Sequence, residues 1–238
     1  GYTLLVATAS YIVNTLLHQN PPYDALKDFA TVSLLGTTPI IIAIHPSLPV
    51  RNLREFIALA RKNPDSLSYG SGGIGSPLHL AGELFNQTAG VRILHVPFKG
   101  TANAAVDLQA GRVQLMFPSS ISVLPQVQAG RLRVLAVMGS KRVAELPEVP
   151  TTAEAGLPQL VVNIWYGLMA PQATPAAIVE QLHREVVNGL ARADIRERMV
   201  STGVVPVGST PAEYAAFAAA ERTRWAAVIK AAKIEIAP

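Results

Sequence analysis

The stretch Tyr69-Gly70-Ser71-Gly72-Gly73-Ile74-Gly75-Ser76-Pro77-Leu78-His79 joins a short apolar run to an amphipathic segment. Four glycines within six positions let the backbone approach another group closely and adopt positive φ angles. Ser76 fits the N-cap of a helix, and Pro77 fits the first helical position. Free N–H groups at a helix start favour an anion. The stretch therefore predicts a loop that binds a carboxylate or a phosphate, with a purely structural turn as the alternative.

Composition limits the class of protein. The chain has 238 residues, of which 50% are hydrophobic and 15% charged, as expected for a globular α/β protein. The formal net charge is +4, but the lysines and arginines form helically spaced clusters, so nucleic-acid binding is not expected. The absence of cysteine excludes thiol catalysis, cysteine-bound zinc and disulfides. No apolar run reaches the ~20 residues that a membrane span requires.

Strand-like and helix-like segments alternate from residue 67 to residue 138. Apolar runs that predict buried parallel strands lie at 67–70, 93–97, 113–117 and 132–138. Helices are expected between them at 77–88, 102–109 and 121–128, followed by Gly90, Gly111 and Gly130 at stop positions. This alternation predicts a doubly wound sheet, in which the loops after the strands share one edge and form the ligand site.

The segments on either side of this block suggest a second βα unit. Strands are expected at 3–8, 32–35, 39–44, 161–170 and 204–207, with helices starting near Ser10 and spanning 53–61, 176–191, 194–202 and 211–232. We expect two lobes, each a mainly parallel sheet flanked by helices: a first lobe of residues 1–38 and 161–238, and a second lobe of residues 39–160. Two lobes with a cleft between them suit a binder that closes about a hinge. The chain begins inside a strand pattern, so an N-terminal strand and helix of the first lobe are expected to be missing.

Catalytic groups are sparse. None of the five histidines has the spacing of a helical metal site, and no acid–base pair or nucleophile–base set is visible, so no metal, cofactor or enzymatic activity is expected. His79 is interpreted either as a ligand contact or as a brace of the loop, and His95 as a core residue. Lys99 either faces an acidic ligand or holds loops together. Thr101 is expected to cap a helix and to offer its hydroxyl to the ligand. Trp165 and Tyr166 belong to a core by default, and at a hinge would form a cleft wall.

Several short motifs, taken in this order, resemble one family of receptors. They are Pro22-Tyr23-Asp24 with Lys27-Asp28-Phe29, the glycine stretch with His79-Leu80-Ala81-Gly82-Glu83-Leu84-Phe85, His95-Val96-Pro97-Phe98-Lys99-Gly100, Leu132-Arg133-Val134-Leu135-Ala136-Val137, Leu146-Pro147-Glu148-Val149-Pro150-Thr151, Glu154-Ala155-Gly156, Trp165-Tyr166-Gly167-Leu168 and Gly208-Ser209-Thr210-Pro211. The chain resembles the Bug-type substrate-binding proteins of tripartite tricarboxylate transporters along almost its whole length.

The resemblance implies a two-lobe, Venus-flytrap receptor of the periplasm that carries a small carboxylate to the permease subunits of a membrane transporter. It implies a carboxylate grip at Ser71, Gly72, Gly73, Gly75 and Ser76, with His79 behind them. It also implies a polar loop of the first lobe at Thr8 and Ser10. The family's glycine-rich first loop would precede Gly1. Ser119 lies where the family tends to carry an acidic or amide residue, so an altered ligand choice is expected.

We therefore expect a monomeric, non-enzymatic receptor of a Gram-negative periplasm. Two alternatives stay open from the residues alone: a cytosolic α/β enzyme that holds a phosphorylated or carboxylate substrate at the same glycine loop, and a ligand sensor for a two-component signalling system. The identity of the carboxylate is not encoded in any motif.

Overall fold

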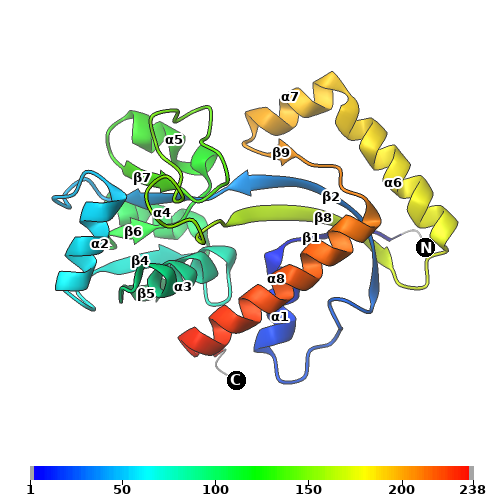
Figure 1. Cartoon of the computed structure of the whole chain (residues 1–238), viewed down its shortest axis with the longest axis horizontal. Helices are drawn as coiled ribbons and strands as arrows, with labels where there is room; N and C mark the ends of the chain where they lie inside the picture. Colours follow the sequence, from blue (N-terminus) through cyan, green and yellow to red (C-terminus); the bar gives the residue numbers. More distant parts are fainter. Residues whose placement is uncertain (1–2, 236–238) are drawn as a thin grey trace. The chain divides into compact units, whose positions relative to one another are not determined.

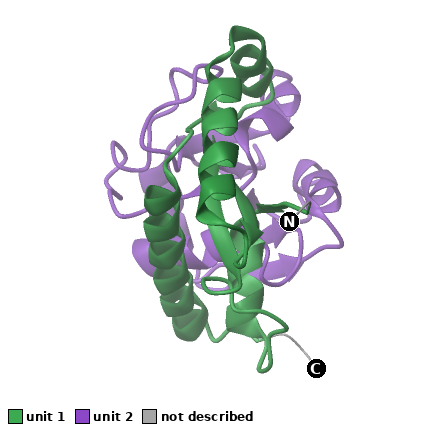
Figure 2. Cartoon of the chain, turned by 90° about the vertical axis from the view of Figure 1, so that its right-hand side faces the viewer, with its two compact units in different colours: residues 1–38, 164–238 green, residues 39–163 purple. Residues whose placement is uncertain are grey.

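The computed structural model describes residues 3–235 and divides into two compact units. Unit 1 consists of Gly1–Thr38 and Ile164–Pro238, and unit 2 of Pro39–Asn163 (Figure 2). The chain thus leaves unit 1 once and returns to it once. The expected lobe boundaries lie at residues 38 and 160, and the assignment of the two units to the lobes of a receptor stays a prediction.

Unit 1 is built on a four-stranded sheet with the order β1-β8-β2-β9 (Figure 1). Its elements are β1 (Leu5–Ala7), α1 (Ala9–Leu17), β2 (Phe29–Pro39), β8 (Asn163–Pro171), α6 (Ala176–Ala191), α7 (Ala193–Ser201), β9 (Val205–Pro206) and α8 (Pro211–Ala232). β1 pairs antiparallel with β8, and β2 pairs antiparallel with β9. The expectation of a mainly parallel sheet is therefore wrong for these two pairs. Antiparallel pairing needs no crossover helix between the paired strands, so the βα alternation does not reveal it.

Unit 2 is built on a five-stranded sheet with the order β5-β4-β6-β3-β7. Its elements are β3 (Ile41–Ile44), α2 (Leu53–Lys62), β4 (Ser68–Ser71), α3 (Pro77–Ala89), β5 (Leu94–Pro97), α4 (Thr101–Gln109), β6 (Leu115–Met116), α5 (Ser120–Gln128) and β7 (Arg133–Val137). β4 pairs in parallel with both β5 and β6, whereas β3 pairs antiparallel with β6 and β7. It follows that β4, β5, β6 and β7 run in one direction, as expected, and that β3 runs against them.

Burial explains the placement of these strands. All four residues of β3 are buried, which fits its uninterrupted apolar sequence and its position between two other strands. β5 instead forms one edge of the sheet, and Leu94 is 50% exposed. The expectation that the 93–97 run is a buried strand is therefore wrong for its strand portion.

Helix ends follow the expected capping signals. The Ser76 hydroxyl accepts a hydrogen bond from the His79 amide (3.3 Å), and Pro77 begins α3. Thr210 and Glu213 form a capping box at the start of α8. The cap of α4 is Gly100, with a φ of 105°, and Thr101 is the first helical residue. The expected capping role of Thr101 is therefore wrong, because the positive φ required before this helix suits glycine.

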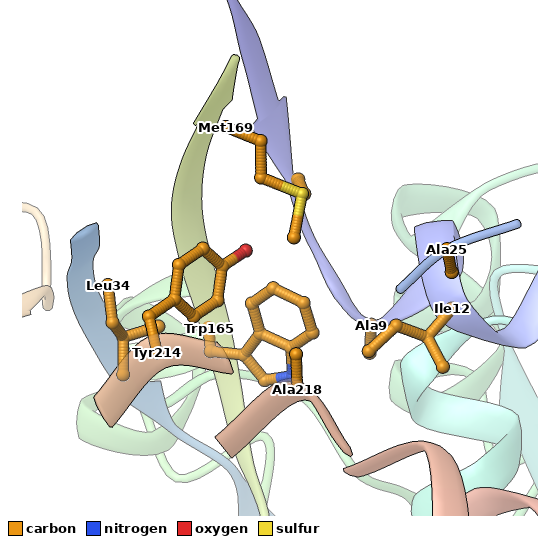
Figure 3. Close-up of a cluster of buried hydrophobic side chains, with 9 residues drawn as sticks. Ala9, Ile12, Ala25, Leu34, Trp165, Met169, Tyr214 and Ala218 are labelled. Atoms are coloured by element: carbon orange, nitrogen blue, oxygen red, sulfur yellow. The ribbon is translucent and has the colours of Figure 1, made fainter. Parts of the chain in front are cut away.

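The core of unit 1 gathers around Trp165. Its ring meets Tyr214 and Phe217 edge to face, and the cluster also includes Met169, Leu34 and Ala218 (Figure 3). The indole N–H groups of Trp165 and Trp225 both donate to Glu221 Oε2, at 2.9 and 2.8 Å. Glu221 itself is only 6% exposed, so a buried carboxylate joins β8 to α8.

Among the described residues, no helix is both long and apolar enough to cross a bilayer.

Candidate functional site

The glycine loop of unit 2 starts at the end of β4 and ends in the first turn of α3. Gly73 and Gly75 have φ angles of 126° and 74°, which L side chains rarely adopt. The amide of Ser76 donates to the carbonyl oxygen of Gly73 (3.2 Å) and closes a tight turn just before the helix. The two left-handed glycines thus allow the strand to turn directly into α3.

The hydroxyl of Ser71 anchors the start of this loop. Ser71 is fully buried, and its Oγ accepts a hydrogen bond from the Gly73 amide (3.1 Å). The same oxygen lies 2.6 Å from His95 Nε2 and 3.1 Å from the Gly73 carbonyl oxygen. Its single proton therefore has two possible acceptors. Ser71 is a bracing residue with its hydroxyl already occupied, not an open ligand contact.

His79 braces the other end of the loop. Its Nδ1 accepts a hydrogen bond from the Gly75 amide (3.1 Å), so the neutral ring carries its proton on Nε2. Its backbone amide is bound to Ser76, and the Tyr69 hydroxyl lies 3.2 Å from its carbonyl oxygen. Of the two expected roles, the brace is the one that these contacts support.

His79 and His95 stack on each other. Their ring centroids are 3.7 Å apart and the ring planes are inclined by 11°. Parallel pairing of β4 with β5 sets Tyr69 opposite His95, and their rings lie 5.0 Å apart. Burial lowers the pKa of His79 to about 4. Burial, with the charge of His79 second, lowers the pKa of His95 to about 3. Both imidazoles are thus neutral near neutral pH.

This bracing decides which amides of the loop remain for a ligand. The amides of Gly73, Gly75 and Ser76 are all bound within the loop, to Ser71, His79 and Gly73 respectively. Within the described chain, the amides of Gly72 and Ile74 have no acceptor. Ile74 is 48% exposed and Gly72 is partly exposed, so solvent reaches this segment. Together with the N-terminus of α3, these two amides form the candidate anion site.

The loop after β5 lies against the glycine loop. A Cβ built on Gly72 would meet Thr101 Oγ1 at 3.0 Å and the Thr101 amide nitrogen at 3.3 Å. The start of α4 thus lies beside the free Gly72 amide, and Thr101 is exposed. Lys99 is also exposed, and its carbonyl oxygen accepts from the Asn103 side chain (2.9 Å). A ligand role for Thr101 and Lys99 stays a prediction.

Ser119 takes the N-cap position of α5, but its side chain makes no capping bond. Its carbonyl oxygen instead accepts from the Ser122 hydroxyl (2.8 Å). Ser119 is partly exposed, and its contact with a ligand stays a prediction.

The candidate residues of unit 1 differ in their exposure. Thr8 is the N-cap of α1 without a side-chain capping bond, and Ser10 lies in the first turn; both are partly exposed. Tyr166 is partly exposed on β8. Trp165 is only 1% exposed and is bound to Glu221. The expected wall role of Trp165 is therefore wrong, and its default assignment to the core is correct, because alternate residues of β8 face opposite sides.

The glycines at 70, 72 and 75 match the spacing of a dinucleotide-binding turn. Gly70, however, lies inside β4, where a Cβ would press on Ala104 Cβ (3.2 Å) and on the Phe98 ring (3.3 Å). That motif also needs an acidic residue near the end of the next strand, for a ribose hydroxyl. Here β5 ends at Pro97 and is followed by Phe98-Lys99. Gly70 thus serves the packing of β4, and the acidic residue that would bind a ribose hydroxyl is missing.

Tyr69 and Glu83 are structural members of the site that the sequence did not indicate. The Tyr69 hydroxyl donates to Glu83 Oε1 (2.6 Å), and burial, then the Glu83 charge, raises the pKa of Tyr69. Tyr69 is the first residue of the glycine stretch, but only the packing of β4 against α3 brings it to Glu83. Among the described residues, no group of three or more histidine or acidic side chains is placed to hold a metal ion.

A two-unit α/β fold with an amide-lined loop at a helix N-terminus is the architecture of a periplasmic solute-binding protein. The family model described as "Tripartite tricarboxylate transporter family receptor" matches residues 1–234. The chain belongs to this family of periplasmic receptors.

Individual relatives agree with this assignment. A protein encoded in the tcbD-tcbE intergenic region of Pseudomonas sp. (strain P51) is 36% identical over 96% of this chain and 68% of its own length. Protein BugT of Bordetella pertussis is 34% identical, over 97% of this chain and 71% of its own. These matches make the chain a relative of the Bug proteins.

Two solved structures extend the comparison to ligands. Rpa4515 of R. palustris, solved with adipate, has a TM-score of 0.86 and 35% identity, covering 99% of this chain and 79% of its own. MatC (Rpa3494) of Rhodopseudomonas palustris, solved with bound malate, has a TM-score of 0.80 and 31% identity, covering 95% and 79%. Both proteins were solved with small dicarboxylates.

Proposed function

We propose that this protein is a non-enzymatic receptor that binds a small carboxylate at the glycine loop of unit 2 and delivers it to the permease of a tripartite tricarboxylate transporter. The observation that carries the proposal is the pair of unbound amides at Gly72 and Ile74, next to the start of α3. Two N–H donors at a helix N-terminus match the two oxygens of a carboxylate.

The net charge of unit 2 favours an anion over a cation as its ligand. Unit 2 contains eleven Lys/Arg and seven Asp/Glu, which gives a formal net charge of +4, whereas unit 1 contains nine of each. The whole formal charge of the chain therefore resides in the unit that carries the loop. A positive field of this kind raises the local concentration and the association rate of an acidic solute.

Binding is tested by thermal unfolding of the purified protein with a panel of solutes: adipate, malate, citrate and, as a phosphorylated comparison, glucose 6-phosphate. A carboxylate present at about a hundred times its Kd stabilises the folded state by about 2.7 kcal/mol, which corresponds to a rise in Tm of roughly 5–10 °C. We expect such a rise for at least one carboxylate and none for glucose 6-phosphate. Turnover of the sugar phosphate, or a rise caused by it alone, would contradict the proposal.

Delivery to a permease is a separate step with its own test. The loaded protein, added to vesicles that contain the membrane subunits of a tripartite tricarboxylate transporter, should support uptake of the labelled carboxylate. Uptake that is equally fast without the protein would show that binding serves another purpose, such as signalling. The expected monomeric state is checked by light scattering of the same preparation.

A further inference from the structure

We propose that His79 is a positioning residue, whose neutral imidazole holds the glycine loop in its binding shape and whose protonation releases the loop. The effect on ligand affinity rests on the proposed function, whereas the effect on the loop does not. The argument starts from the hydrogen bond between the Gly75 amide and His79 Nδ1.

The Gly75 amide depends on His79 for its only acceptor in the described structure. Gly75 is buried and holds a φ of 74°, so its N–H has no access to bulk water as a substitute. A buried amide without an acceptor costs free energy, and the loop must rearrange to avoid it. Loss of the Nδ1 acceptor therefore moves the residue that lies directly after Ile74, whose free amide belongs to the candidate site.

Protonation removes this acceptor without removing a side chain. An imidazolium has a proton on both nitrogens, so Nδ1–H would point at the Gly75 N–H, donor against donor. The backbone amide of His79 stays bound to Ser76, and the ring stays packed against His95 and Tyr69. The charged ring and the loop are therefore incompatible in the observed geometry.

The charge of His79 makes protonation of His95 harder, so His79 takes up its proton first. The stacked rings, 3.7 Å apart, disfavour a charge on either ring while the other is charged. Ser71 fixes His95, because Ser71 Oγ lies 2.6 Å from His95 Nε2. The Ser71 hydroxyl can accept a hydrogen bond from His95 Nε2–H while it donates its own to the Gly73 carbonyl oxygen, so a charged His95 keeps its contact. The loop thus responds to the charge of His79 rather than to that of His95.

Burial sets the range of pH in which His79 acts, and three titratable groups lie around it. They are His95 from β5, Tyr69 from β4 and Glu83 from α3, and the Glu83 carboxylate is bound by the Tyr69 hydroxyl (2.6 Å). Burial lowers the pKa of His79 to about 4, so the loop is held at neutral pH and is released in acid. A receptor of this design retains its solute near neutrality and releases it when the surroundings become acidic.

Two variants separate the acceptor from the titration. His79→Asn keeps an oxygen near the position of Nδ1 and cannot be protonated, whereas His79→Leu fills the same space without an acceptor. His18→Gln, at an exposed histidine of unit 1, is the control. The Kd for adipate and for malate is measured at several pH values from neutral to about pH 4. The ratio of wild type to variant cancels the titration of the ligand itself.

We expect His79→Leu to weaken binding about tenfold at neutral pH, the value of one hydrogen bond, and His79→Asn to bind within about twofold of wild type. Towards acid, wild type should lose affinity relative to His79→Asn, while His18→Gln follows wild type. Wild-type affinity in His79→Leu, or a wild-type to His79→Asn ratio that does not change with pH, would overturn the inference.

A measurement without ligand keeps the inference testable if the leucine variant does not fold. In ¹⁵N-labelled wild type, a scalar coupling across the hydrogen bond should join the Gly75 amide nitrogen to His79 Nδ1, and it should vanish as His79 titrates. Its absence at neutral pH overturns the inference. Its presence, together with no binding of either dicarboxylate, supports the loop-holding role and counts against the proposed function alone.

Discussion

The ring of Tyr69 occupies the space that a side chain on Gly82 would need, because a Cβ built on Gly82 would overlap the ring atoms Cε2 and Cζ. Tyr69 lies on β4 and Gly82 in the middle of α3, so this contact sets how closely the helix approaches the strand. The same ring carries the hydroxyl that binds Glu83 and lies beside His79. The absence of a side chain at Gly82 thus allows α3 to pack close to β4 and brings Tyr69, Glu83 and His79 together.

Gly82→Ala should destabilise the protein by about 1–3 kcal/mol, the usual cost of an overpacked core, although alanine is the better helix former. The free energy of unfolding is measured with urea. Gly189→Ala in α6 is the matched control, because its nearest outside atom is Ile195 Cδ1 at 3.9 Å. That control should stabilise by about 0.5–1 kcal/mol. A stabilising effect at both positions would show that Tyr69 moves aside at no cost.

Gly73→Val should abolish the rise in Tm that a carboxylate causes. The φ of 126° is strained for any L side chain, so the loop must rearrange and displace the neighbouring amides of Gly72 and Ile74. Gly156→Val carries a similar strain, at a φ of 95° and with open space around it, in a different loop of unit 2. It should lower Tm but leave the ligand-induced rise intact. An undiminished rise in Gly73→Val would place the carboxylate elsewhere.

Stability should fall as the pH is lowered from about 6.5, because both stacked histidines have depressed pKa values in the folded protein, about 4 for His79 and about 3 for His95. The unfolded chain takes up protons at its ordinary histidine pKa, whereas the folded chain resists them, so the stabilisation is complete above pH ~6.5 and is lost towards pH ~3. The slope is on the order of 1 kcal/mol per pH unit for each histidine.

This slope is measured by urea unfolding, followed by far-UV circular dichroism, at a series of pH values. His79→Asn should flatten the curve by the share of one histidine, and His18→Gln should leave it unchanged. A wild-type slope that His79→Asn does not alter would mean that His79 titrates normally in the folded state.

Glu221→Ala should destabilise unit 1 by about 3 kcal/mol, because it leaves the indole N–H groups of Trp165 and Trp225 without their acceptor. Both N–H groups are buried with their rings, each 1% exposed. Glu185→Ala, at an exposed position of α6, should change stability by less than about 0.5 kcal/mol. Urea unfolding checks both variants. If the midpoint of unfolding is the same for Glu221→Ala as for Glu185→Ala, water replaces the Glu221 carboxylate.

The helices of this fold are largely predictable from local signals. α6 and α8 have the expected bounds, 176–191 and 211–232, and Thr210 and Glu213 form a capping box at the start of α8. α3 likewise begins at Pro77 behind its Ser76 cap. Such signals are contained within a few neighbouring residues, so the sequence reveals them without knowledge of the rest of the chain.

The pairing of strands is less predictable, because it depends on residues far apart in the sequence. β3 reads as an apolar strand, but nothing in its sequence reveals that it inserts antiparallel between β6 and β7. β2 extends over Phe29–Pro39, far beyond the apolar run at 32–35, because pairing with β9 continues it through Gly36 and Thr37. The hydrophobic pattern alone therefore underestimates the length of such strands.

The candidate site shows the same division. The loop, its cap and its left-handed glycines were predicted, since they are local. The stacking of His95 on His79 was not, because it requires the parallel register that sets His95 opposite Tyr69. The number of amides left for a ligand depends on the orientation of two side chains within the loop, since His79 and Ser71 accept hydrogen bonds from two of them.

The two indoles bound to Glu221 provide an intrinsic fluorescent probe of this protein. The chain has two tryptophans, and both belong to unit 1. Selective excitation of tryptophan therefore follows the unfolding of unit 1 and gives no signal from unit 2. Comparison of emission with circular dichroism during denaturation reveals, without any added dye, whether the two halves melt together or in turn.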